Sequence, residues 1–155
     1  MKPLPKYSIT TQRSRFDVSM IHRFLRTSYW AQDIPRGVVV KCIRNSLCFA
    51  AFYGQKQIGF ARVITDRATF AYLADVFVLP GHRGRGVARL MISKILAHRD
   101  MQGLRRILLA TKDAHGLYTP FGFMPPIHPE HFLTIALPEV YRKRARAKTK
   151  QQSAP

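Results

Sequence analysis

The sequence predicts a single α/β domain with a mixed, mostly antiparallel central sheet flanked by helices. Two observations predict it. The first half of the chain holds apolar runs joined by short turns, as in hairpins, and the second half alternates strand, helix and strand. The chain of 155 residues, 46% of them hydrophobic, is long enough for one domain with a real core and too short for two.

Hydrophobic periodicity and turn residues place the elements along the chain. Residues 1–15 contain prolines and basic residues, which predicts an irregular N-terminal arm or a short edge strand, before a domain over 16–140. The expected elements are a helix over 17–29, a second over 38–45, strands over 47–53, 57–65 and 68–78, a helix that ends near 98, a buried strand over 106–111 and a final strand over 131–137.

Charge is the unusual feature of the composition. The chain has 26 Lys and Arg against 8 Asp and Glu, a formal net charge of +18. Six of the positive charges lie in a C-terminal tail over 141–155, which we expect to be disordered, and the rest of the chain is basic too. Such a field attracts polyanions, so nucleic acid is a possible partner. No aromatic residues alternate with the tail charges, which favours a solvated tail and a positive face for an anionic cofactor.

The sequence gives little support for a membrane-spanning segment, a secretory signal or a metal site. No apolar run approaches the roughly 20 residues that span a bilayer, and the first residues lack the apolar core of a secretory signal. We therefore expect a cytoplasmic protein without membrane contact. Cys42 and Cys48 are expected to be reduced and buried, although a bridge between them is not excluded. His128 and His131 have no nearby cysteine or carboxylate pair, so no metal is expected.

The stretch from Val78 to Ala88 is the most informative part of the chain. An apolar strand runs into a glycine-rich turn, and the turn runs into an amphipathic helix. The first N–H groups of a helix have no internal partner, and the helix dipole there favours an anion. Gly84 and Gly86 keep side chains away from that backbone, while Arg83 and Arg85 add positive charge. This pattern predicts a phosphate-binding turn.

Two common glycine-rich signatures do not match this turn. A Walker-type loop needs Lys-Ser or Lys-Thr after its last glycine, and Val87-Ala88 stands there; the dinucleotide spacing G-x-G-x-x-G also fails. The pattern R-x-x-G-x-A, formed by Arg83, Gly86 and Ala88, does match. It resembles the acetyl-CoA-binding signature of the GCN5-related N-acetyltransferase (GNAT) superfamily. An ordinary strand-to-helix turn is the alternative.

A second region strengthens the resemblance. The strand over 106–111 is followed by Tyr118 and then by Gly122-Phe123, in the order and at the spacing of the family's catalytic tyrosine and closing turn. The resemblance covers roughly residues 16 to 137. It implies the acyl-CoA N-acyltransferase fold, in which the sheet splays in the middle, between the strands over 68–78 and 105–111.

The resemblance also implies where acetyl-CoA would bind. The pantetheine arm would pair with the splayed strand as though it were another strand. Asp113 occupies the position of an asparagine that contacts the arm in many relatives. The expected cofactor-binding residues are Val76, Phe77, Val78, Arg83, Gly84, Arg85, Gly86, Val87, Ala88, Asp113, Tyr118 and Phe121.

Acetyl transfer to an amine requires a neutral amine, a stabilised carbonyl oxygen and a proton for the leaving thiolate. Tyr118 is the candidate acid, with a core tyrosine as its alternative. Polyamine acetyltransferases of the superfamily carry a Glu-Asp pair where this chain has Ala74-Asp75. Asp75 would relay a proton or bind a cationic acceptor, or it would pair with a neighbouring arginine. His115 is a weaker candidate base, and ordered water can carry the proton instead.

The acceptor is expected against the loop that contains Tyr29, Trp30 and Asp33, although the two aromatic residues also suit core packing. Small amines, amino-acid-like metabolites and protein amines all stay open. Neither motif contains a cysteine, which favours direct transfer over an acyl-enzyme. The alternative function is a non-catalytic acyl-CoA-binding or nucleic-acid-associated regulatory protein on the same fold. A monomer and a homodimer are both compatible with the sequence.

Overall fold

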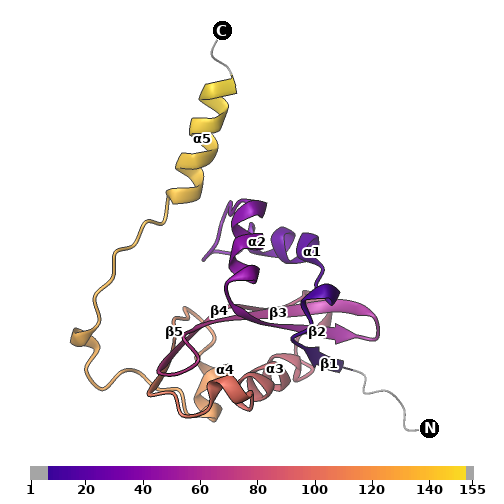
Figure 1. Cartoon of the computed structure of the whole chain (residues 1–155), viewed down its shortest axis with the longest axis vertical. Helices are drawn as coiled ribbons and strands as arrows, with labels where there is room; N and C mark the ends of the chain where they lie inside the picture. The colour runs from indigo at the N-terminus through magenta and orange to yellow at the C-terminus, as the bar shows by residue number, and fades with distance from the viewer. Residues whose placement is uncertain (1–6, 153–155) are drawn as a thin grey trace.

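The computed structural model describes residues 7–152, which form one five-stranded sheet covered by helices on both faces (Figure 1). The strands lie in chain order and are β1 (Tyr7–Thr10), β2 (Leu47–Tyr53), β3 (Lys56–Thr65), β4 (Phe70–Val78) and β5 (Arg106–Leu109). Neighbouring strands from β1 to β4 are antiparallel, and β5 is parallel to β4. The predicted fold class, mixed and mostly antiparallel, is confirmed.

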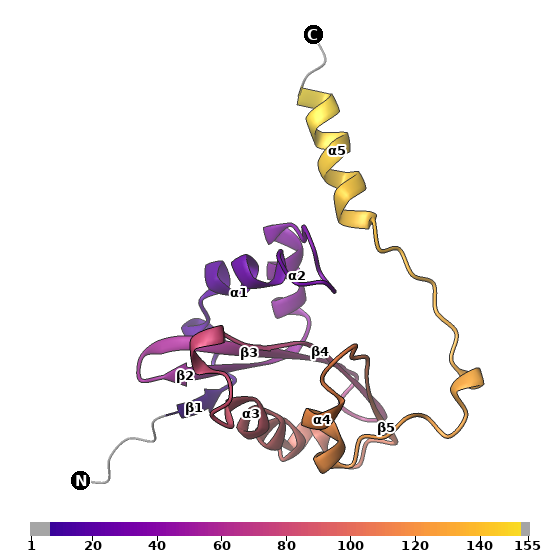
Figure 2. The ribbon, with the colours of Figure 1, turned by 180° about the vertical axis from the view of Figure 1, so that it is seen from behind.

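Two helices cover one face of the sheet and two cover the other, as both ribbon views show (Figures 1 and 2). The helices are α1 (Val18–Leu25) and α2 (Arg36–Arg44) on one face, and α3 (Val87–Leu96) and α4 (His115–Tyr118) on the other. Alternate residues of each strand enter opposite cores, as period 2 requires. In β2, for example, Phe49 packs with α3, whereas Cys48 packs under α1 and α2.

β4 contains the irregularity that positions the site. Phe60 pairs with Phe77 and Arg62 pairs with Ala74, so β4 has one residue more than β3 over this span. This is a β-bulge, and Asp75 within it adopts a left-handed backbone conformation with φ of 55°. β5 pairs with β4 only as far as Leu73. Beyond that point the two strands separate, which confirms the predicted splay.

The C-terminal part differs from the prediction. β5 is half-buried rather than buried, and among the described residues the stretch 131–137 forms no strand. It is an exposed, extended chain that follows a short 3-10 turn over Pro129–His131. β5 therefore lies at the sheet edge, and the missing neighbour explains its exposure.

The basic tail also differs from the prediction. The structure has a helix, α5 (Val140–Gln152), where we expected disorder; residues 153–155 lie outside the described part. The charge suggested a solvated coil, but Ala, Lys, Arg and Gln are all strong helix formers. At the other end, the expected arm contributes the edge strand β1. No helix in the described range 7–152 is long and apolar enough to span a bilayer.

Candidate active site

Two clefts adjoin on the splayed side of β4. The first, which we call the turn cleft, has a volume of about 500 Å³ and surrounds the turn before α3. The second, the splay cleft, has a volume of about 580 Å³ and lies where β4 and β5 separate. Val78 and Leu117 line the turn cleft, and Val76 and Tyr118 line the splay cleft. The two clefts therefore follow each other along β4 and α4.

The turn cleft is built on backbone. Gly84 and Gly86 both adopt left-handed conformations, with φ of 69° and 77°, which favour glycine. A Cβ at either position would meet open space, so a side chain there would project without contacting the protein. Gly86 caps α3 without a side-chain bond, and the first helical hydrogen bond runs from Leu90 N to Gly86 O at 2.9 Å. The N–H groups before Leu90 are thus available to an anion.

Arg83 has a contact that sequence analysis did not foresee. Its Nε donates to the carbonyl oxygen of Val78 at 2.8 Å, which ties the turn to the end of β4. Its positive charge stays at the wall of the turn cleft. His82 was also missed: it lines the same cleft and lies 3.3 Å from the Tyr7 hydroxyl. No sequence spacing could have revealed this contact, because it depends on β1 lying beside β2.

Asp75 lies in the splay cleft, in a buried ion pair. Its Oδ2 accepts a hydrogen bond from Arg62 Nε at 2.7 Å, and its Oδ1 accepts one from the Trp30 indole at 3.1 Å. Arg62 also donates to the Ser46 hydroxyl at 3.2 Å. Burial lowers the pKa of Arg62 and the Asp75 charge raises it, with a net upward shift. Protonation of Asp75 would break this pair, so the geometry favours the arginine-pairing role over that of a base.

Tyr118 lies in the same cleft, almost fully buried at the end of α4. Its ring packs against Phe123 with the centroids 5.7 Å apart. Burial raises the pKa of Tyr118 to about 12, with a smaller contribution from Tyr29. The phenol therefore stays protonated at neutral pH. It is a group that can donate a proton or a hydrogen bond in a site shielded from water.

The α1–α2 loop and the β5–α4 loop meet at the mouth of the splay cleft. Tyr29 Oη accepts a hydrogen bond from the Lys112 backbone N–H at 3.3 Å, and its ring is 5.0 Å from that of Trp30. Both aromatic side chains are largely exposed, at 58% and 42%. They form a wall of the cleft, as the acceptor hypothesis requires. Asp33 instead pairs with Arg142 of α5 at 3.6 Å.

The remaining predicted residues divide into two groups. Asp113 is exposed and lines the splay cleft, and His115 is exposed as the first residue of α4. Phe77 and Phe121 are core residues: Phe77 stacks on Phe24 at 3.8 Å, and Phe121 packs against the core under α3. Neither residue lines either cleft, and Arg85, which is exposed, does not line them either.

Several residues that line the splay cleft were not predicted as site residues, among them Arg62, Cys42 and Tyr141. Tyr141 belongs to α5, beyond the boundary expected for the domain. Both cysteines are free thiols. Cys42 is half-buried in the cleft wall, and burial raises the pKa of the Cys48 thiol to about 12.

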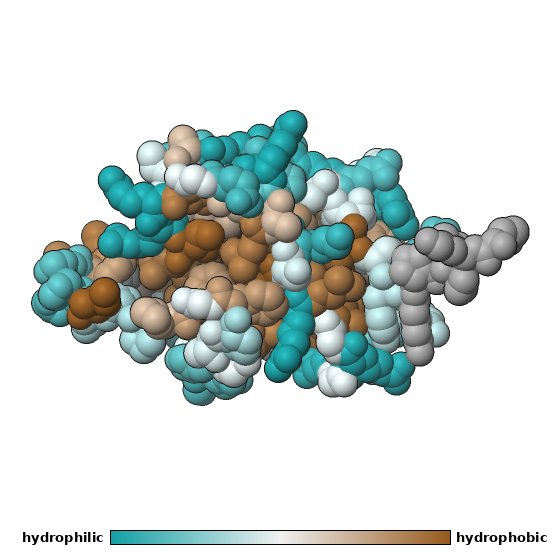
Figure 3. All heavy atoms as spheres, turned by 90° about the horizontal axis from the view of Figure 1, so that it is seen from below, coloured by the Kyte–Doolittle hydropathy of each residue, from teal (hydrophilic) through white to brown (hydrophobic). Residues whose placement is uncertain are grey.

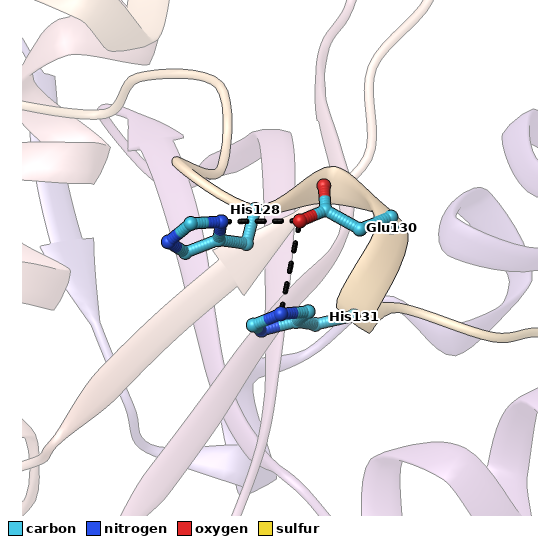
Figure 4. Close-up of side chains that lie close together, drawn as sticks. All are labelled: His128, Glu130 and His131. Atoms are coloured by element: carbon cyan, nitrogen blue, oxygen red, sulfur yellow. Dashed lines mark hydrogen bonds and ion pairs between the residues drawn. The ribbon is translucent and has the colours of Figure 1, made fainter.

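One cluster of metal-ligand types lies outside both clefts (Figure 4). His128 Nδ1 and His131 Nε2 lie 3.1 and 3.7 Å from the same carboxylate oxygen of Glu130, which sequence analysis overlooked. The two imidazole rings stack with centroids 4.7 Å apart. All three side chains are exposed, and the hydrogen bond and ring contact account for their arrangement. The absence of a bound metal stays a prediction.

Comparisons with known proteins agree with this geometry. The sequence model of the acetyltransferase (GNAT) domain matches residues 44–125. A Gibberella zeae protein named as an acetyltransferase is 30% identical over 72% of this chain and 75% of its own length.

Solved structures give the same result. A Xanthomonas campestris pv. campestris protein, assigned to the GNAT family as an acetyltransferase, is 48% identical. Its TM-score is 0.86 over 90% of this chain and 99% of that chain. A Clostridium acetobutylicum protein, assigned as an acetyltransferase and solved with acetyl-CoA, shares the fold at 17% identity. Its TM-score is 0.61 over 86% of this chain and 96% of that one. The chain therefore belongs to the GNAT family of acetyltransferases.

Proposed function

We propose that the protein is an acetyl-CoA-dependent N-acetyltransferase that transfers the acetyl group directly to a primary amine. The observation that carries this proposal is the succession of the two clefts along β4 and α4. The N-terminus of helix α3 is followed by a stretch of β4 that β5 does not pair, and then by a buried, protonated tyrosine. Acetyl-CoA carries a diphosphate, an amide-containing arm and a thioester in the same order, so each part would meet a protein group that suits it.

The residues of the turn cleft fit the phosphate end of acetyl-CoA. The N–H groups at the start of α3 and the charge of Arg83 suit an anion, and the two glycines leave the space open. Past Leu73, the edge of β4 that faces β5 offers backbone groups to the amides of the arm. The solved Clostridium acetobutylicum relative with acetyl-CoA supports the same ligand class.

Acetyl-CoA supplies the acetyl group as a thioester. In the proposed reaction the amine nitrogen forms a bond to the carbonyl carbon, and the carbon–sulfur bond breaks. Tyr118 donates its proton to the departing sulfur, and a backbone N–H near Phe77 or Val78 polarises the carbonyl oxygen. The amine proton passes to water, and a proton from water restores the Tyr118 phenol. We assign Asp75 a positioning role, because it holds Arg62 and the indole of Trp30 in place.

The acceptor would enter between Trp30 and Tyr29, whose exposed rings suit the cationic form of an approaching amine. The proposal is tested by mixing the protein, acetyl-CoA and a panel of primary amines and measuring the thiol released. The expected result is amine-dependent thiol release together with an acetylated amine detected by mass spectrometry. Thiol release without acetylated amine, or none with any amine, would contradict the proposal.

The second candidate, a non-catalytic regulator that docks on nucleic acid, rests on the basic helix α5, which projects from the body (Figure 2). Removing residues 143–155 leaves the Arg142 contacts with Asp33 and Gln32 in place. If α5 binds a duplex, this truncation weakens binding and reduces its salt dependence. Amine acetylation that survives the truncation would assign the two activities to separate parts of the chain.

A further inference from the structure

The splay cleft has an unusual concentration of tyrosine and tryptophan. The chain has six tyrosines and one tryptophan, and five of these seven residues line the cleft: Tyr29, Trp30, Tyr72, Tyr118 and Tyr141. All ten phenylalanines lie within the described part of the chain, and none of them lines this cleft. Other surfaces of the molecule do gather hydrophobic residues, as on the face that carries α3 and α4 (Figure 3). Rings that carry a polar group are typical of a surface that meets a ligand, whereas a core uses phenylalanine equally well.

The five rings come from distant parts of the chain. Tyr29 and Trp30 belong to the α1–α2 loop, Tyr72 to β4, Tyr118 to α4 and Tyr141 to α5. Their exposure falls from 58% for Tyr29 and 42% for Trp30 at the mouth of the cleft to 7% for Tyr118. The aromatic lining therefore extends from the mouth of the cleft to the proposed acid.

Trp30 is held in place although it is exposed. Its indole N–H donates to Asp75 Oδ1 at 3.1 Å. Its ring lies 6.4 Å from that of Phe24 and 5.0 Å from that of Tyr29, edge to face with the latter. A side chain that is already fixed loses little conformational freedom when a ligand contacts it. Trp30 is therefore a preorganised wall for a flat ligand.

The charges of the splay cleft cancel one another. Four charged residues line it, and Arg62 and Lys112 are balanced by Asp75 and Asp113. Both carboxylate oxygens of Asp75 already accept hydrogen bonds, so Asp113 is the one exposed carboxylate that the described lining offers. A polyamine needs several such groups, and the net charge of +18 repels it further. This charge pattern favours an acceptor with a single amine.

We propose that the acceptor is a small primary monoamine attached to a flat aromatic ring, an inference that rests on the proposed acetyltransferase function. The amine points toward Tyr118, and the aromatic body lies against the exposed rings of Trp30 and Tyr29. Aromatic rings in offset or edge-to-face contact attract each other beyond the effect of buried area. A saturated ring of similar size would gain the burial alone.

The binding part of this proposal can be tested without turnover. Trp30 is the single tryptophan of the chain, so its fluorescence reports on this wall. The full chain is titrated, with CoA present, with 2-phenylethylamine, 2-cyclohexylethylamine and spermidine. We expect 2-phenylethylamine to change the fluorescence saturably, with a Kd roughly 2- to 10-fold below that of 2-cyclohexylethylamine, the range for an aromatic pair. Spermidine should bind more weakly than either.

Acetylation of the same amines tests whether the wall selects the acceptor. The measured quantity is the ratio of kcat/KM for 2-phenylethylamine to that for 2-cyclohexylethylamine. In Trp30→Leu, which keeps an apolar side chain, this ratio should fall toward one. A merely structural loss would lower both values and leave their ratio unchanged. Tyr53→Leu is the matched control: Tyr53 has the same 42% exposure as Trp30 but does not line the cleft, so the ratio should stay that of the wild type.

The outcomes separate this proposal from acetyl transfer itself. Spermidine acetylated as efficiently as 2-phenylethylamine would overturn the acceptor class while the transferase activity stands. Equal kcat/KM for the two ring amines, or a wild-type ratio in Trp30→Leu, would overturn the role of the aromatic wall. No acetylated product from any amine would contradict the proposed function. The fluorescence titration then decides the aromatic site separately: saturable binding with the expected preference supports it, and no binding overturns it.

Discussion

Arg62 Nε and Asp75 Oδ2 lie 2.7 Å apart at the bulge where β4 turns away from β5. The two side chains are 15% and 8% exposed, so water screens the pair little. The same carboxylate accepts the Trp30 indole. The ion pair thus connects two neighbouring strands to the loop that carries Trp30 at the splay cleft.

Replacing one partner of this ion pair with an apolar residue should destabilise the folded protein. Asp75→Leu leaves the Arg62 charge uncompensated in a buried site, and Arg62→Met does the same to Asp75. We expect each to lower the free energy of unfolding by about 3–5 kcal/mol. The double variant should lose much less than the sum, since no unpaired charge stays behind. Urea unfolding followed by circular dichroism measures all three variants, and simple additivity would show that the two groups are not coupled.

Acetyl-CoA should raise the melting temperature of the protein, because a ligand that binds only the folded state stabilises it. In Gly86→Leu this shift should vanish, since the new side chain would project into the turn cleft. The variant also forces leucine into a left-handed conformation, at a cost of roughly 1–2 kcal/mol.

Gly103→Leu is the matched control for that strain. Gly103 has φ of 71°, close to the 77° of Gly86, and a Cβ there would also meet open space. Gly103 lines neither cleft. Both variants should melt at lower temperature than the wild type, but only Gly103→Leu should keep the acetyl-CoA shift. If Gly86→Leu keeps it as well, the phosphate site lies elsewhere.

Tyr118→Phe should reduce kcat and kcat/KM together by about 10²- to 10⁴-fold, the range for a positioned general acid. Phenylalanine keeps the ring and its packing against Phe123, so cofactor affinity and melting temperature should change little. Tyr53→Phe, at an exposed tyrosine outside both clefts, is the control. Turnover close to wild type in Tyr118→Phe would assign the proton to water or to His115.

Tyr118 should also make the free energy of unfolding depend on pH in the alkaline range. Its pKa is about 12 in the folded protein, against 10.0 for an ordinary tyrosine. Between these values the unfolded chain loses the proton first, so the stability that is fully present below pH 10 falls as the pH rises towards 12. Two pKa units correspond to about 2–3 kcal/mol. Cys48 contributes in the same direction, so the informative quantity is the difference between wild type and Tyr118→Phe in urea titrations at pH 9 and at pH 11. Parallel losses in the two proteins would contradict the shift.

The sequence by itself determined the local parts of the site. The turn from Val78 to Ala88 could be predicted because its chemistry lies in consecutive residues. Glycines accept the left-handed angles observed at Gly84 and Gly86, and the helix that follows presents its N–H groups there. Alternating apolar residues likewise predicted β2, β3 and β4 with small errors at their ends. Tyr118 was singled out through the resemblance to the GNAT family, because Tyr118 and Gly122-Phe123 match the family's tyrosine and closing turn in order and spacing.

Only the tertiary structure decided which distant groups meet. The partner of Asp75 depends on the register of β3 against a bulged β4, and no pattern within either strand indicates that register. The contact of Tyr7 with His82 and that of Asp33 with Arg142 likewise join residues far apart in the chain. Arg62 was therefore overlooked, and Asp33, which was expected beside Tyr29 and Trp30, does not line the splay cleft.

The stretch 131–137 shows most clearly how local sequence and tertiary structure decide different things. Its alternation predicts a strand, since side-chain period is a local property, but among the described residues the structure has no strand there. A strand also needs a neighbouring edge with which its backbone can pair, and in the described structure the segment has none. Local strand propensity depends on consecutive residues of the chain. Pairing depends on where the rest of the chain, or a second chain, places a free edge, and only the folded arrangement determines that.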